Sequence, residues 1–145
     1  MKGRKRHITR EDHDLHFQGQ FPFAAILGCA DSRVSPELIF DQDQGDLYVV
    51  RVAGTIVGNG ELASMEYAVT HLGVRLLLVL GHENCGAVRA AVETADAPGT
   101  IGFLLREIAP AVEEARAVGV LLLDNAIIAN VRRSARLLAS GNEPM

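Results

Sequence analysis

Two short segments contain both cysteines of this chain, each beside another side chain that can bind a metal. The first segment has Cys29 and Asp31, and the second has His82 and Cys85. Together these residues offer two thiolates, a carboxylate and an imidazole, which is a full ligand set for tetrahedral zinc. Soft thiolates with an imidazole favour zinc over calcium or magnesium, because those ions prefer oxygen ligands.

The fourth ligand would distinguish a catalytic zinc site from a structural one. Catalytic zinc keeps three protein ligands and an open position, whereas structural zinc is usually closed by four. Asp31 could close the site, or Arg33 could hold its carboxylate away in a bidentate pair, so that Asp31 orients a water at the open position. The same two residues could equally form an ordinary structural ion pair, so their spacing leaves these alternatives open.

An apolar run ending in Leu-Gly precedes each segment, which predicts that a β-strand delivers each set of ligands. Strands are expected at 23–27, 47–52 and 74–80, because these runs are short, apolar and rich in strand-forming residues. Helices are expected from Pro36, over 62–72, from near Cys85, and over 100–118 and 122–139.

The alternation of strands and helices predicts an α/β fold, in which helices cover both faces of a parallel sheet. Ligands in such sheets bind beyond the carboxyl ends of the strands, where the strand order reverses. The first and third strands should therefore be neighbours, so that Cys29 meets His82 and Cys85. A glycine just before each ligand segment would let the backbone turn sharply there.

Length and composition are those of one domain, with 145 residues of which 48% are hydrophobic. We expect a flexible N-terminal arm at 1–20 and a single zinc-binding α/β domain at 21–145. The net charge of −4 makes nucleic acid and anionic membranes poor partners, and no apolar stretch is long enough to span a bilayer. The start has no signal-like apolar segment, and two cysteines without a disulfide framework indicate a cytoplasmic protein.

Four longer motifs resemble those of β-class carbonic anhydrases, in the family's order and within a match from Gly19 to about Ala139. They are Cys-Ala-Asp-Ser-Arg-Val (29–34), Asp-Leu-Tyr-Val-Val-Arg-Val-Ala-Gly (46–54), Glu-Tyr-Ala-Val (66–69) and Gly-His-Glu-Asn-Cys-Gly-Ala-Val (81–88). The resemblance implies a helix-flanked parallel sheet, and one zinc per subunit held by Cys29, His82 and Cys85. It also implies that Asp31 and Arg33 form a pair beside the metal, and that the protein converts carbon dioxide reversibly to bicarbonate and a proton.

The resemblance also implies residues near the substrate. Gln20 matches a glutamine that members with an accessible site often contribute across a dimer, and Tyr48 and Tyr67 match aromatic positions of the pocket. Carbon dioxide needs only a small apolar slot with a donor or two, for which Val52 and the backbone amide of Gly86 are further candidates. Tyr48 and Val52 would equally suit the core of a strand. The expected assembly is a homodimer or a tetramer.

The chain departs from the family at its C-terminal end. Family members usually continue past the last helix into further strands, and these are missing or shortened here. Three strands alone would expose an apolar edge, which proteins normally cover. We therefore expect that the sequence is incomplete, or that a partner subunit or the helix over 122–139 covers this edge.

Two alternative functions would use the same ligands. Related enzymes hydrolyse carbonyl sulfide or carbon disulfide, and the shape of the slot rather than the ligand set would decide between these substrates and carbon dioxide. A non-catalytic zinc-binding scaffold would result if Asp31 closed the metal site.

Overall fold

The computed structural model describes residues 10, 14, 17–94 and 96–141. Most of the expected arm at 1–20 lies outside the described residues, and its last four residues, 17–20, are exposed. The division of the chain at residue 20 stays a prediction. No helix within the described part of the chain is long and apolar enough to cross a membrane.

Three parallel strands form a sheet in the order β2-β1-β3. They are β1 (Ala24–Cys29), β2 (Leu47–Val52) and β3 (Leu76–Leu80). All residues of the central strand β1 are buried, as expected for an apolar run with a neighbour on each side. Cys29 pairs with Val52, and Gly28 pairs with Leu80. The predicted adjacency of the first and third strands is therefore confirmed.

Every expected helix is present in the structure. The helices are α2 (Pro36–Ile39), the 3-10 turn η1 (Ala53–Thr55), α3 (Asn59–Thr70), α4 (Gly86–Glu93), α5 (Thr100–Val118) and α6 (Leu122–Ser140). Helix α3 begins before the expected residue 62 because the backbone N–H of Gly58 donates to the Glu61 carboxylate at 3.0 Å, which caps its first turn. Strand β3 begins after the expected residue 74 because the N–H of Val74 donates to the carbonyl of Ala68 where α3 ends.

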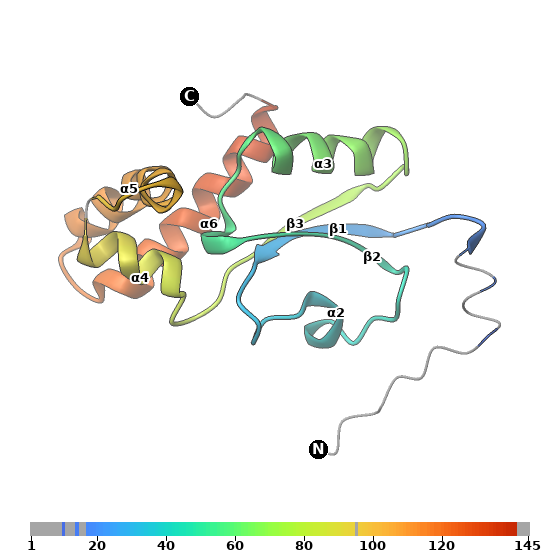
Figure 1. Cartoon of the computed structure of the whole chain (residues 1–145), viewed down its shortest axis with the longest axis horizontal. Coiled ribbons are helices and arrows are strands. Elements are labelled where there is room, and N and C mark those ends of the chain that lie inside the picture. The colour runs from blue at the N-terminus through green and yellow to red at the C-terminus, as the bar shows by residue number, and fades with distance from the viewer. Residues whose placement is uncertain (1–9, 11–13, 15–16, 95, 142–145) are drawn as a thin grey trace, which may run out of the picture.

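Helices cover the two faces of the sheet unequally (Figure 1). Helices α3 and α6 lie along one face, where Leu27 of β1 belongs to a buried cluster with Leu62 and Met65 of α3. The other face carries the short helix α2, whose Leu38 is 74% exposed. The predicted parallel sheet flanked by helices is therefore confirmed, although only this short helix lies on the second face. The connection from β1 to β2 forms a single turn of helix, which is too short to cover that face.

Strand β3 lies at an edge of the sheet. Within the described ranges no strand pairs with its free side, and only helices follow it along the chain. Helix α6 contacts β3, yet Leu76 and Leu77 remain 52% and 37% exposed. The expected cover by the last helix is therefore incomplete, and an apolar sheet edge is left accessible.

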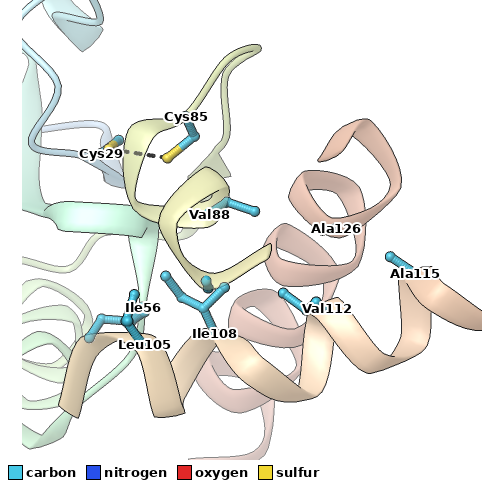
Figure 2. Close-up of a cluster of buried hydrophobic side chains, with 10 residues drawn as sticks. Cys29, Ile56, Cys85, Val88, Leu105, Ile108, Val112, Ala115 and Ala126 are labelled. Atoms are coloured by element: carbon cyan, nitrogen blue, oxygen red, sulfur yellow. Dashed lines mark hydrogen bonds between the residues drawn. The ribbon is translucent and has the colours of Figure 1, made fainter. Parts of the chain in front are cut away.

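A second buried cluster lies beyond the carboxyl ends of the strands, where α4, α5 and α6 pack together (Figure 2). Ile108 of α5 is fully buried in this cluster, and Val88 of α4 contributes to it. Cys29 and Cys85 belong to the same cluster. The three helices therefore form an apolar support directly beneath the two thiols.

Ile108→Ala should lower the free energy of unfolding by about 2–5 kcal/mol, because it removes a fully buried side chain and leaves a cavity. Ile101 lies on the same helix but is 59% exposed, so Ile101→Ala should change stability by about 0.5 kcal/mol or less. Urea unfolding followed by circular dichroism measures both values. Equal losses in the two variants would contradict the burial of α5 by the face that carries Ile108.

Candidate metal centre

Cys29 and Cys85 come from two separate elements and meet at the carboxyl end of the sheet. Cys29 is the last residue of β1, and Cys85 is the N-cap residue of α4. Their sulfur atoms lie 3.9 Å apart, and both residues are buried (Figure 2). The parallel pairing of β1 with β3 produces this meeting, because the segment that follows β3 leads directly into α4.

His82 presents one nitrogen to the cysteines. Its Nδ1 lies 2.9 Å from the carbonyl oxygen of Glu83, which can only accept, so Nδ1 carries the proton and Nε2 keeps a lone pair. Among the described residues Nε2 is buried without a hydrogen-bond partner. The ligand atoms of Cys29, His82 and Cys85 all lie within 4.8 Å of one another.

This donor set fits a metal cation. A buried nitrogen lone pair without a partner is costly, and a bound cation would satisfy it. Two sulfur ligands and one imidazole form a soft to borderline set, which suits zinc and other late transition metals. The three residues therefore make a preformed cradle, with ligand atoms on three sides.

Asp31 lies beside the cradle and is held by Arg33. The Arg33 Nε and Nη2 atoms donate to the two carboxylate oxygens of Asp31 at 2.9 and 2.6 Å, and the Arg33 backbone N–H adds a bond of 3.0 Å. These hydrogen bonds hold the pKa of Asp31 far below its ordinary value, so the group is a carboxylate. One of its oxygens lies 3.9 Å from Nε2 of His82. Asp31 thus reaches the site while both of its oxygens are bound to Arg33.

Arg51 is a site residue that the reading of the sequence missed. Its Nε donates to the carbonyl of Cys29 at 2.9 Å, and its Nη2 donates to the carbonyl of Asp31 at 2.5 Å. The guanidinium therefore fixes the backbone that carries a cysteine ligand and the neighbouring carboxylate. The available signal was a single arginine inside an otherwise apolar strand, close to its carboxyl end.

The two thiols share a proton. The hydrogen bond from Cys85 lowers the pKa of Cys29 to about 4, and backbone hydrogen bonds at Asp31 and Gly54 act in the same direction against the effect of burial. The same bond to Cys29, together with burial, raises the pKa of Cys85. One of the two thiols is therefore the more readily deprotonated, and a bound metal would require both as thiolates.

Of the remaining candidate residues, some lie beside the cysteines and the others lie away from them. Val52 pairs with Cys29 across the sheet, and Gly86 directly follows Cys85, with open space where a Cβ on Gly86 would lie. Tyr48 pairs with Ala25 near the opposite end of the strands. Its ring lies 6.4 Å from that of Tyr67, which is half exposed.

Gln20 is exposed on the segment before β1. Within one chain the structure brings Val52 and Gly86 to the cysteines, but not Gln20, Tyr48 or Tyr67. Tyr48 lies away from the cysteines because of its position in β2, four residues before the strand end that meets the ligands.

Comparison with known proteins gives consistent results. Residues 24–141 match the family model described as carbonic anhydrase. Carbonic anhydrase 2 of Mycobacterium tuberculosis is 43% identical over 130 residues, which is 86% of this chain and 63% of that protein. The carbonic anhydrase of Mycolicibacterium smegmatis is 38% identical over 135 residues, which is 86% of this chain and 66% of that protein.

Solved structures show the same relationship. The β-carbonic anhydrase CcaA has a TM-score of 0.80 at 28% identity, covering 90% of this chain and 65% of that one. A Coccomyxa β-carbonic anhydrase in complex with acetazolamide has a TM-score of 0.76 at 29% identity, covering 90% and 62%. The chain therefore spans a little under two thirds of the length of these proteins.

The metal-free protein should show about one thiolate per chain near pH 6, since the pKa of Cys29 is about 4 and that of Cys85 is raised. Thiolate absorbance in the ultraviolet during a pH titration measures this number. Cys85→Ala removes the hydrogen-bond donor, so the pKa of Cys29 should rise and the thiolate signal should appear only at higher pH. A signal that is absent near neutral pH in the unmodified chain would contradict the shared proton.

Proposed function

Because the chain belongs to the β-class carbonic anhydrase family, we propose that it catalyses the reversible hydration of carbon dioxide to bicarbonate and a proton. One observation carries the proposal: Cys29, His82 and Cys85 bring their ligand atoms together beside the Asp31–Arg33 pair. Family membership alone would not be enough for the proposal, because a family member that lacked these three ligands would have no metal site.

The three cradle residues would hold one zinc ion per chain. Zinc, when bound, lowers the pKa of water and so supplies hydroxide near neutral pH, which is a nucleophile for the weakly electrophilic carbon of carbon dioxide. The bidentate bond from Arg33 occupies both oxygens of Asp31 and supports a site with three protein ligands. This arrangement favours a catalytic site over the closed scaffold.

Asp31 would then act as a fixed acceptor. Its carboxylate cannot donate, because Arg33 keeps it ionised, so it accepts a hydrogen bond from the attacking oxygen and directs a lone pair of that oxygen toward carbon. Arg33 in turn keeps the carboxylate in place, with a further contact of 3.3 Å from its Nη2 to the carbonyl of Asn84. The pair orients the nucleophile and keeps an acceptor beside it.

Val52 and Gly86 would border the slot for carbon dioxide. Val52 supplies an apolar wall beside Cys29, which suits a small uncharged substrate. The backbone N–H of Gly86 belongs to the first turn of α4, where N–H groups have no partner inside the helix, so it can donate to an oxygen of carbon dioxide or bicarbonate.

We further propose that copies of the chain assemble as a homodimer or a tetramer in the cytoplasm. The exposed side chains of Leu38 and Leu76 support an assembly, since Leu38 lies on the short helix α2 and Leu76 lies on the edge strand β3. A related structure at 26% identity, with a TM-score of 0.70, is one of two tetrameric β-carbonic anhydrases from Sordaria macrospora. Gln20 and Tyr67 are both exposed and would be free to reach a partner's slot.

Hydration activity of the zinc-loaded protein should rise from neutral to alkaline pH. The thiolates of Cys29 and Cys85 cancel the charge of a dication, so the nucleophile forms at higher pH than with neutral imidazole ligands. Stopped-flow mixing with carbon dioxide and a pH indicator measures the rate, and Cys29→Ser serves as a control that loses a ligand. Absence of activity across this range would overturn the proposed function, and a rate that stays flat into the acid range would contradict the argument from the thiolates.

Arg33→Ala should lower the rate of hydration by roughly tenfold or more while zinc stays bound, because the freed Asp31 carboxylate can move onto the metal and close the site. Metal analysis shows whether zinc stays bound, and the stopped-flow assay measures the rate, so a loss of rate can be distinguished from a loss of zinc. Arg106→Ala is the matched control, since Arg106 is an exposed arginine of α5 that pairs with Asp96 outside the site. Unchanged activity in Arg33→Ala would show that Asp31 needs no partner.

A further inference from the structure

Two buried polar side chains of α6 bind the turn that follows β2. Asn130 is 3% exposed, and its Nδ2 donates to the carbonyl of Gly54 at 2.6 Å. Ser134 is 1% exposed, and its Oγ donates to the carbonyl of Thr55 at 2.7 Å. Asn130 and Ser134 lie one helical turn apart, so both reach consecutive carbonyls of the η1 turn.

The turn has a conformation that needs support. Gly54 has φ of 70° and Thr55 has φ of 55°, and the left-handed region is costly for a β-branched residue such as threonine. Backbone in this region persists where its surroundings hold it in place. The two hydrogen bonds from α6 supply that support, and they also satisfy carbonyl groups that would otherwise be buried without a donor.

The same turn packs against the two elements that carry the cysteines. It contacts β1, which ends at Cys29, and α4, which begins directly after Cys85. Gly54 is closely packed, because a Cβ at this position would lie 2.7 Å from Cδ1 of Ile108 and 3.1 Å from the Cβ of Ala87. The turn therefore has little room to shift, and a change in its backbone would disturb its packing against α4.

Helix α6 also contacts the segment that carries the other two ligands. Gly81 lies directly before His82, and a Cβ on Gly81 would collide with the side chain of Val131 in α6. Val131 follows Asn130 in the helix, so adjacent residues of α6 contact the η1 turn and the residue that precedes His82. This placement distinguishes α6 from a helix that merely covers the sheet.

We propose that Asn130 is a positioning residue for the metal ligands, with Ser134 as its auxiliary. From α6, Asn130 holds Gly54 in the turn that packs against Ala87, two residues after Cys85. Outer hydrogen bonds that hold the backbone around metal ligands orient those ligands, so their loss changes both the metal affinity and the geometry of the site. The inference rests on the proposed zinc site and adds the residues that maintain its geometry.

The test compares Asn130→Ala and Ser134→Ala with the unmodified chain. Zinc affinity is measured by competition with a chromophoric chelator, and the geometry at sulfur is measured from the thiolate-to-cobalt charge-transfer band of the Co²⁺-loaded protein. Asn130→Ala should weaken zinc binding by about tenfold or more and shift the band, as loss of an outer hydrogen bond does in metal sites. Ser134→Ala should act in the same direction with a smaller effect.

Met65→Ala is the control for general loss of stability. Met65 is 1% exposed and packs against the sheet in the other buried cluster, so its removal should lower the melting temperature while leaving the cobalt band in place and zinc affinity within about twofold.

Unchanged zinc affinity and an unchanged cobalt band in folded Asn130→Ala would overturn the positioning role, and so would an equal loss of affinity in Met65→Ala. If Asn130→Ala does not fold, Ser134→Ala decides by the same two readouts. An unmodified chain that binds zinc and hydrates carbon dioxide keeps the proposed function even when the variants overturn this inference. A chain that binds no zinc overturns both.

Discussion

The parallel pairing of β1 with β3 is the interaction on which the rest of the structure depends. It places Gly28 opposite Leu80, so the chain leaves both strands at the same edge of the sheet. Cys29 emerges directly there, and the segment after β3 brings His82 and then Cys85 to the same place. Ligands that are more than fifty residues apart in sequence thus come within reach of one ion without any long loop. Both faces of β1 are buried, which ties the geometry of the site to the stability of the core.

Around the ligands, guanidinium groups organise the backbone and the carboxylate. Arg33 holds Asp31 by both oxygens, and Arg51 holds the carbonyls of Cys29 and Asp31. An arginine suits this task because its planar donors match a carboxylate or a pair of carbonyls in a fixed geometry. These contacts hold the backbone and the carboxylate around the three ligand residues, whose ligand atoms lie within 4.8 Å of one another. Among the described residues Nε2 of His82 is buried without a hydrogen-bond partner, which suits a site that a cation would fill.

The two ends of the sheet differ in how they are supported. At the carboxyl end, helices α4, α5 and α6 pack beneath the thiols, and α6 adds the buried polar contacts of Asn130 and Ser134. The face that carries α2 and the free edge of β3 remain partly apolar and accessible, as the exposure of Leu38 and Leu76 shows. The partly apolar, accessible edge of the sheet is consistent with the proposed assembly of copies of the chain.

The sequence by itself determined the strands, the helices and the set of possible metal ligands. Short apolar runs predict strands, and thiolates beside an imidazole predict zinc, because both signals are local. Their meeting point was also predictable, since parallel strands bring their carboxyl ends to one edge. Tertiary structure placed the Asp31 carboxylate 3.9 Å from Nε2 of His82, a contact that its local pairing with Arg33 does not predict. It also decided the contacts between residues far apart in the sequence. Asn130 reaches Gly54, 76 residues away, only because α6 packs beside the η1 turn, and no periodicity in the sequence predicts that contact.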